Sequence, residues 1–397
     1  MEGGTESIAC NYNVDHLATS DIKHNEKRWL ACGFNQFGQL SKFHDERIIR
    51  YFKEIDVRAT HLISSWSYVA AANGCSLQIR GLINSRTKSE KLIKAENEIK
   101  CLAGCDRYCL ILLNNGTVYK YGIQCEDGLK EVIFQSNESF TPKNKSIFGK
   151  TTSACASKVK IEKIACGNNI MIALGLSNEV FTGTTQVHCF PKHVRSKQLV
   201  CGFEHALMLT HNGDIYAWGN GLRGQLGLGV IGVEEKPVLI EAIAGIKIIC
   251  IAAAGWHSAA ISAFGDIYTW GFNSNGQLGI KMYKNCTIKE PAIYVVPQVV
   301  DIMELTCCDN KEQDCFPTKI ATGARHTMVE MNCGAVYAAG WNAYGQLGLP
   351  NNELYTDHFQ YVLKFKNCKD NVEIVSGSWN TLIGTRESSK REINENI

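Results

Sequence analysis

Short apolar runs alternate with glycine-containing turns along most of the chain, and three stretches repeat one order of apolar and polar positions. Each has a histidine, a run of small and apolar residues, a turn glycine eight residues after the histidine, an alternating segment and a final glycine. One of them runs from His205 through Asn212-Gly213 to Gly219. Asparagine-glycine between apolar runs is a strong hairpin signal, and alternation is typical of a strand. The pattern therefore predicts consecutive β-meanders.

The repeated histidines and glycines have a structural explanation that requires neither catalysis nor ligand binding. The histidines are His205, His257 and His326, and we expect each to hold a turn by a hydrogen bond rather than to act in catalysis. A Gly-Gln-Leu phrase follows each repeat, beginning at Gly224, Gly276 and Gly345. Glycine there allows a tight loop in which a larger residue would clash. The phrase lacks the Gly-Lys-Ser/Thr ending of a phosphate-binding loop, so we expect no nucleotide site.

Weaker copies extend the repeat over the whole chain. The expected strand-end glycines are Gly33, Gly81, Gly122, Gly183, Gly219, Gly271 and Gly340. Their mean spacing of about 51 residues lies in the range of β-propeller blades. The segment after Trp29 is the second half of a repeat, and the segment after Val375 is a first half. We therefore predict an all-β, seven-bladed propeller whose N- and C-terminal strands share one blade, since closure removes exposed sheet edges.

The boundaries follow from the same pattern. We expect a propeller over residues 28–385 and disordered tails at 1–27 and 386–397. Three polar segments exceed what a blade needs, at 84–98, 123–160 and 281–316, and they are expected to be inserted loops. The self-complementary ends favour a complete chain over a targeting unit cut from a larger ligase or kinase.

Composition narrows the class of function. With 41 basic and 39 acidic residues, the chain has no general attraction for nucleic acid or anionic membrane. It has no run of 18 apolar residues and no signal peptide, so its 18 cysteines are expected to be reduced. Cys101, Cys105 and Cys109 would lie on one face of a strand, and neither they nor the cluster at 307–315 has zinc-finger spacing. We expect no metal, no cofactor, no small-molecule substrate and no enzyme activity.

These phrases resemble the repeats of the regulator of chromosome condensation, a family of seven-bladed propellers. The resemblance is specific from Gly202 to Gly348 and weak from Gly81 to Gly183. Other phrases are similar to a branch of the family that contains little beyond the repeats: Ser65-Trp66-Ser67-Tyr68, Gly255-Trp256-His257-Ser258 and Trp379-Asn380-Thr381. Similarity to that branch implies a non-catalytic scaffold in the nucleus, on chromosomes, with a cytoplasmic pool. It also implies a JmjC-domain oxygenase as partner, a link to histone H3 methylation and a contact with histone or nucleosome.

The resemblance also points to partner-facing residues. In the better-known family member, the residue before the repeated histidine faces the partner surface. The matching positions here are Ser67, Arg107, Glu204, Trp256, Arg325 and Trp379. Tryptophan and arginine are enriched in interface hot spots, and the alternative is that these side chains only seal the propeller.

A second function follows from the same family. Its founding member is a guanine-nucleotide exchange factor, which implies exchange on a Ran-like small GTPase as the alternative function. That activity needs a wedge projecting from the propeller, and the sequence does not reveal one. The N-terminal segment is also not notably basic, unlike a chromatin-binding tail.

Overall fold

The computed structural model describes residues 27–41, 46–125, 128–137, 158–281, 292–300, 315–349, 353–365, 372–385 and 391–392. Residues 1–26 of the expected N-terminal tail and 386–390 and 393–397 of the expected C-terminal tail lie outside the described residues. Lys27 and Arg391–Glu392 are in strands, which corrects the expected tail boundaries. So do residues 138–157, 282–291 and 301–314 within the expected insertions. Among the described residues, no helix is long and apolar enough to cross a membrane.

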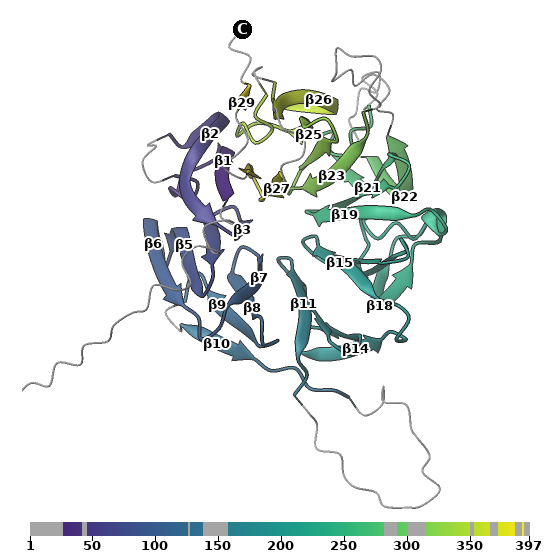
Figure 1. Cartoon of the computed structure of the whole chain (residues 1–397). Coiled ribbons are helices and arrows are strands. Elements are labelled where there is room, and N and C mark those ends of the chain that lie inside the picture. Colours follow the sequence, from purple (N-terminus) through teal and green to yellow (C-terminus); the bar gives the residue numbers. More distant parts are fainter. Residues whose placement is uncertain are drawn as a thin grey trace, which may run out of the picture.

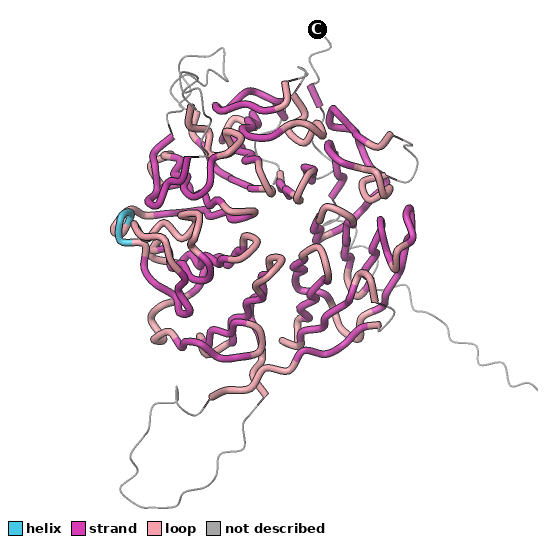
Figure 2. Tube along the Cα trace, turned by 180° about the vertical axis from the view of Figure 1, so that it is seen from behind, coloured by secondary structure: helices cyan, strands magenta, loops and turns pink. Residues whose placement is uncertain are grey.

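The described strands form seven antiparallel sheets around a central axis, so the predicted all-β, seven-bladed propeller is confirmed (Figures 1 and 2). Blade 1 contains β1 (Lys27–Phe34), β2 (Ile48–Ala59), β27 (Glu373–Ser376) and β28 (Asn380–Thr385). Blade 2 contains β3 (His61–Ser64), β4 (Tyr68–Asn73), β5 (Ser76–Ile83) and β6 (Arg86–Lys94). Blade 3 contains β7 (Ile99–Gly104), β8 (Tyr108–Leu113), β9 (Val118–Gly122) and β10 (Leu129–Val132).

The remaining blades follow in chain order. Blade 4 contains β11 (Ile161–Cys166), β12 (Met171–Gly175), β13 (Glu179–Thr182) and β14 (Thr185–Cys189). Blade 5 contains β15 (Ser196–Cys201), β16 (His205–Thr210), β17 (Ile215–Asn220) and β18 (Val233–Leu239), and the short 3₁₀ helix η2 (Glu241–Ile243) follows it. Blade 6 contains β19 (Ile248–Ala254), β20 (His257–Ser262), β21 (Ile267–Asn273) and β22 (Ala292–Val300). Blade 7 contains β23 (Pro317–Thr322), β24 (His326–Met331), β25 (Ala335–Trp341), β26 (Tyr355–Phe365) and β29 (Arg391–Glu392).

The chain ends close the propeller as predicted. In blade 1, β1 pairs antiparallel with β28, with Trp29 opposite Gly384 and Gly33 opposite Asn380. The Trp29 side chain is fully buried and packs in a cluster with Leu382. The two ends of the chain are therefore joined both by sheet hydrogen bonds and by shared hydrophobic packing.

The three expected insertions were partly wrong, because each contains the outermost strand of its blade. These strands are β6, β10 and β22. Most residues of β6 are exposed, and its sequence Arg-Thr-Lys-Ser-Glu-Lys-Leu-Ile-Lys is mostly polar. An outer strand that faces water on both sides carries little apolar alternation, so the pattern did not reveal it. Charged outer strands also protect the sheet edge from pairing with other chains.

Five of the predicted strand-end glycines are required by a close backbone approach: Gly33, Gly81, Gly219, Gly271 and Gly340. Gly271 has a φ of 101°, and a Cβ there would lie 2.6 Å from the carbonyl oxygen of Trp256. The equivalent distance is 2.5 Å at Gly219 and 2.4 Å at Gly340. No side chain fits there. Glycine lets the end of the third strand lie close to the turn between the first and second strands.

Gly183 does not belong to this set, which corrects the sequence prediction. It lies in the tight hairpin between β13 and β14, and a Cβ there would have nothing within 4 Å. Blade 4 therefore turns back earlier than the repeat pattern indicated.

We predict that Gly271→Ala lowers the free energy of unfolding by roughly 1–3 kcal/mol, because alanine is strained at positive φ and meets a carbonyl oxygen. Urea unfolding followed by tryptophan fluorescence measures the change. Gly232→Ala is the matched control, because a Cβ there has open space, and its effect should stay within about 0.5 kcal/mol. Equal losses in the two variants would contradict the steric explanation.

Candidate interaction face

The antiparallel meander brings two sets of loops to one end of the propeller. In each blade, the turn between the first and second strands opens at the same end as the loop between the third and fourth strands. In blade 5 these segments are residues 202–204 and 221–232. We call this end the loop face. All the residues predicted to face a partner lie in its turns between first and second strands.

The repeated histidines fasten each blade to the next just below this face. All three are fully buried. The Nε2 atom of His205 lies 2.8 Å from the Ser258 hydroxyl of the following blade. Two further pairs repeat the contact at 3.0 Å: His257 with Thr327, and His326 with Thr381. Each hydroxyl is the residue directly after the histidine position of its own blade.

The hydroxyl also fixes the histidine tautomer. The Ser258 hydroxyl donates its one hydrogen to the carbonyl oxygen of Gln225, 2.8 Å away. It must therefore accept a hydrogen from Nε2 of His205. Burial lowers the pKa of each of the three histidines to about 3, so they are neutral at physiological pH. The histidine side chains thus join neighbouring blades rather than hold a turn as predicted: in this histidine relay the imidazole donates to a hydroxyl, which donates to the carbonyl of a Gly-Gln-Leu loop.

Other residue types take the histidine position elsewhere and still reach the next blade. In blade 1, Asn380 places its side-chain oxygen 2.6 Å from the Ser64 hydroxyl of blade 2. In blade 2, the Tyr68 hydroxyl lies 2.9 and 3.0 Å from the carbonyl oxygens of Cys105 and Tyr108 of blade 3, and its one hydrogen is donated between these two acceptors. The function of the position is preserved although the residue differs, which explains why the repeat was weak there.

The predicted partner-facing residues are anchored by their own carbonyl groups. The carbonyl oxygen of Trp256 accepts a hydrogen bond of 2.9 Å from Phe272, the residue after the strand-end glycine. The same bond joins Glu204 to Asn220 at 2.9 Å and Arg325 to Trp341 at 2.8 Å. The backbone at these positions is therefore fixed, and only the side chains can vary.

Trp256 lies at the seam between blades 5 and 6 and is half-buried. The Arg223 guanidinium carbon lies 3.8 Å from the centre of the indole, and the ring of Phe203 meets it edge to face at 5.3 Å. Both neighbours belong to blade 5. The stacked cation and aromatic rings make a rigid patch of the kind that forms interface hot spots.

Trp379 joins a longer row of aromatic side chains that crosses blades 7, 1 and 2. The row runs Trp379, Tyr344, Phe34, Phe37 and Trp66, with ring centres 5.2–5.9 Å apart in edge-to-face contacts. All five are half-buried and so keep exposed area on the loop face. The sequence prediction missed the middle three, although each follows a strand-end glycine or lies in a Gly-Gln-Leu loop.

Three of the predicted residues carry charge on the loop face. Arg325 is half-buried and donates to Asn275 at 3.3 Å, and Arg107 is exposed and donates to the carbonyl of Asn168. Glu204 is half-buried in blade 5. The face therefore combines both signs of charge with the aromatic clusters.

Ser67 is 1% exposed, so it cannot face a partner, which corrects that prediction. Its position is covered by Gln39 of blade 1. That side chain packs beside Gly81 and donates to the Trp66 carbonyl.

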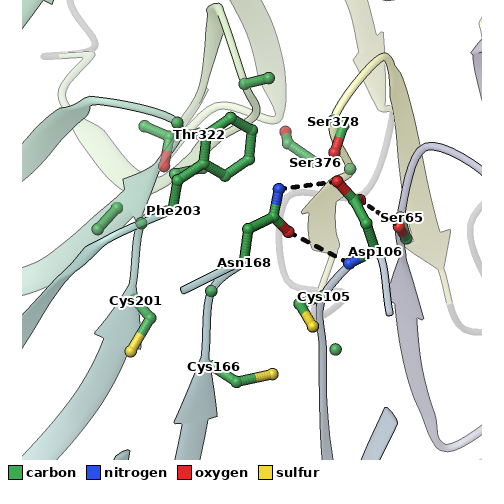
Figure 3. Close-up of a pocket in the computed structure, with 18 of the residues that line it drawn as sticks. Ser65, Cys105, Asp106, Cys166, Asn168, Cys201, Phe203, Thr322, Ser376 and Ser378 are labelled. Carbon is green, nitrogen blue, oxygen red and sulfur yellow. Dashed lines mark hydrogen bonds between the residues drawn. The ribbon is translucent and has the colours of Figure 1, made fainter. Parts of the chain in front are cut away.

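A cavity of about 130 Å³ lies where the first strands of the blades end at the loop face (Figure 3). The Asp106 carboxylate lines the cavity, and each of its oxygens accepts a hydrogen bond. The Ser65 hydroxyl donates at 2.8 Å and the Asn168 amide at 2.7 Å. Asn168 also accepts from the Asp106 amide at 3.2 Å. The carboxylate therefore links blades 2, 3 and 4.

The cysteines near this cavity do not share one strand face, contrary to the sequence prediction. Cys101 lies in β7, Cys109 in β8 and Cys105 in the turn between them. Cys105 lies near Cys166 of blade 4 (Figure 3), and interaction with that thiol lowers the pKa of Cys105 to about 7. Within the described part of the chain, no group of three potential metal ligands is present.

The comparisons with known proteins agree with this architecture. Residues 212–261 and 265–329 match the regulator of chromosome condensation (RCC1) repeat, and residues 197–225 match a second form of that repeat. Human RCC1 domain-containing protein 1 is 33% identical over 222 residues, which cover 50% of this chain and 58% of that protein. The chain thus aligns with little more than half the length of this relative.

Solved structures show the same fold. Prp20p of Saccharomyces cerevisiae, whose structure was described with its binding properties to Gsp1p and histones, superimposes with a TM-score of 0.68. The identity is 18%, and the match covers 96% of this chain and 97% of Prp20p. Human WBSCR16 superimposes with a TM-score of 0.67 at 15% identity, covering 91% of this chain and 100% of that one.

Fold and repeats together define a closed seven-bladed propeller made of repeats that are tied by a buried histidine relay. Residues 197–261 and 265–329 match RCC1 repeats, and the chain shares its propeller fold with Prp20p.

The histidine relay makes stability depend on pH. The folded protein takes up protons at these histidines only near pH 3, whereas the unfolded chain does so below about pH 6.5. Acid therefore favours the unfolded state, and stability is lost as the pH falls below 6.5. Each histidine should contribute a slope of up to roughly 1.4 kcal/mol per pH unit.

We predict that His257→Asn, which introduces the residue type that blade 1 has at Asn380, folds and shows a shallower loss of stability between pH 6.5 and 4.5. Urea unfolding at several pH values measures both slopes. His211→Asn is the control, because His211 is exposed and should not change the slope. An unchanged slope in the His257 variant would show that the buried histidine does not resist protonation.

Proposed function

We propose that this protein is a non-catalytic interaction scaffold whose loop face binds a JmjC-domain oxygenase that acts on histone H3 methylation state. In this proposal it works in the nucleus, on chromosomes, with a cytoplasmic pool, and also contacts histone or nucleosome. The proposed domain is the propeller at 28–385, extended by Lys27 in β1 and by Arg391–Glu392 in β29.

The observation that carries the scaffold proposal is the composition of the loop face. Two clusters of half-buried aromatic side chains are held on fixed backbone, one with Arg223 stacked on it. Rigid aromatic and arginine side chains bind partners at low cost in conformational entropy. The same residues also fill seams between blades, so sealing the propeller and offering a surface are compatible roles.

The partner is inferred from similarity. The phrases at Trp66, Trp256 and Trp379 resemble the family branch that implies a JmjC oxygenase, and human RCC1 domain-containing protein 1 aligns with half of this chain. Histone contact is favoured by the fold shared with Prp20p, whose binding to histones was described with its structure.

We predict that Trp256→Ala/Arg325→Ala/Trp379→Ala loses most of the JmjC oxygenase that the native protein retains. The measurement is affinity purification of the tagged protein from its own cells, followed by quantitative mass spectrometry. Phe264→Ala/Tyr51→Ala/Arg86→Ala is the control, because these side chains are exposed outside the two aromatic clusters. Equal melting temperatures establish that both variants are folded. Undiminished recovery with the first variant would place the partner elsewhere.

Guanine-nucleotide exchange on a Ran-like small GTPase is the second candidate, favoured by the fold shared with Prp20p, which was described with its binding to Gsp1p. A nucleotide-release assay separates the two functions. The scaffold proposal predicts that catalytic amounts of this protein leave the release of fluorescent GDP from the GTPase unchanged. Release that accelerates in proportion to added protein would make exchange the primary function.

A further inference from the structure

The Gly-Gln-Leu phrase occurs in blades 1, 5, 6 and 7 and is absent from blades 2, 3 and 4. In blades 1, 5 and 6, the glutamine of the Gly-Gln-Leu phrase packs beside the strand-end glycine of the next blade. The contacts are Gln39 with Gly81, Gln225 with Gly271 and Gln277 with Gly340. Blade 4 has no such phrase, because β13 and β14 are joined by the short hairpin at Gly183. The neighbour that blade 4 offers to Gly219 of blade 5 is the tip of Ile170.

The missing loop leaves a cavity of about 470 Å³ between blades 4 and 5, between the strands labelled β14 and β18 in Figure 1. Its apolar lining comes from Ile170, Val187, Trp218 and Val233. It opens on the loop face, next to Glu204 and Asn220. We call it the blade 4–5 groove.

Two buried polar atoms of the groove lining have no hydrogen-bond partner. One is Nε1 of Trp218, a side chain that is 1% exposed. At the equivalent position of blade 6, Nε1 of Trp270 donates to the carbonyl oxygen of Gln225 at 2.9 Å. The other is the Thr182 hydroxyl. Because an unsatisfied buried donor is costly, the groove is short of a backbone carbonyl that the missing loop would have supplied.

The groove also carries uncompensated negative charge. Glu204, Glu234 and Glu235 line it, and among the described residues none of the three forms a salt bridge and no lysine or arginine lines the cavity. The amides of Asn169 and Asn220 donate to the two oxygens of Glu204 at 2.9 and 3.1 Å. These bonds orient the carboxylate without neutralising it.

We infer that the blade 4–5 groove binds an extended peptide segment of a partner protein that carries an arginine or lysine. The peptide takes the place of the missing loop: its backbone supplies the hydrogen-bond acceptor, its carbon chain covers Ile170 and Val187, and its cation meets the glutamates. A free small cation would satisfy the charge but neither the apolar walls nor the orphaned donors. The inference rests on the proposed scaffold function, since the groove opens on the same face.

The test uses fluorescein-labelled heptapeptide pools with random flanks and a central arginine, lysine or citrulline, measured by fluorescence anisotropy on the full chain. We expect the arginine or lysine pool to bind and the citrulline pool, of the same shape without charge, to bind much more weakly. Glu234→Gln/Glu235→Gln should raise the Kd of the basic pool roughly tenfold. Glu241→Gln/Glu353→Gln changes net charge equally at exposed sites away from the groove and should not alter binding.

Two further variants separate the groove from the rest of the loop face. Val187→Trp, which fills the groove without changing charge, should abolish binding while the melting temperature stays near that of the native protein. Trp256→Ala/Arg325→Ala/Trp379→Ala should bind the basic pool normally. If that variant loses the peptide while the glutamine pair retains it, the groove assignment fails and the scaffold proposal stands. Equal binding of the citrulline and arginine pools would also overturn the groove assignment.

Discussion

The buried hydrogen bond between neighbouring blades is the interaction on which the propeller depends. A four-stranded blade is apolar on both faces and cannot stand alone, so its orientation against the next blade must be fixed. The histidine relay does this in a buried seam, where a neutral imidazole donates to a hydroxyl that in turn donates to a loop carbonyl. Because the loop carbonyl belongs to the Gly-Gln-Leu phrase, the same bond network shapes the surface above it.

This coupling explains why the loop face is both rigid and variable. The backbone before each histidine position is tied to the residue after the strand-end glycine, so side chains there can change without changing the frame. Blade 4 shows what happens when the phrase itself is lost. The blade remains in the propeller with Ile170 at the seam, but the surface gains a groove. The length of one loop thus determines the surface beside the next blade.

Much of the fold could be predicted from the sequence, because the strongest repeats carry both halves of the relay, such as His205 and Gln225. Prediction failed where a residue's role depends on a neighbour remote in the chain. The polar strand β6 has no apolar alternation because its sides face water, and Gly183 resembled a strand end although the hairpin turns there. The aromatic row was missed for the same reason, since Phe34 meets Tyr344 only after the propeller closes.

The shared blade has a consequence for synthesis on the ribosome. β1 emerges first, but its partner β28 follows about 350 residues later, which at roughly 5–20 residues per second is tens of seconds. During that interval β1 is paired with β2 on one side, but its other edge has no strand to pair with. A chain that stalls before β28 would present this edge, together with the apolar seam of blade 7, to other nascent chains. Protection of this edge in an unfinished molecule therefore depends on a single late strand, β28.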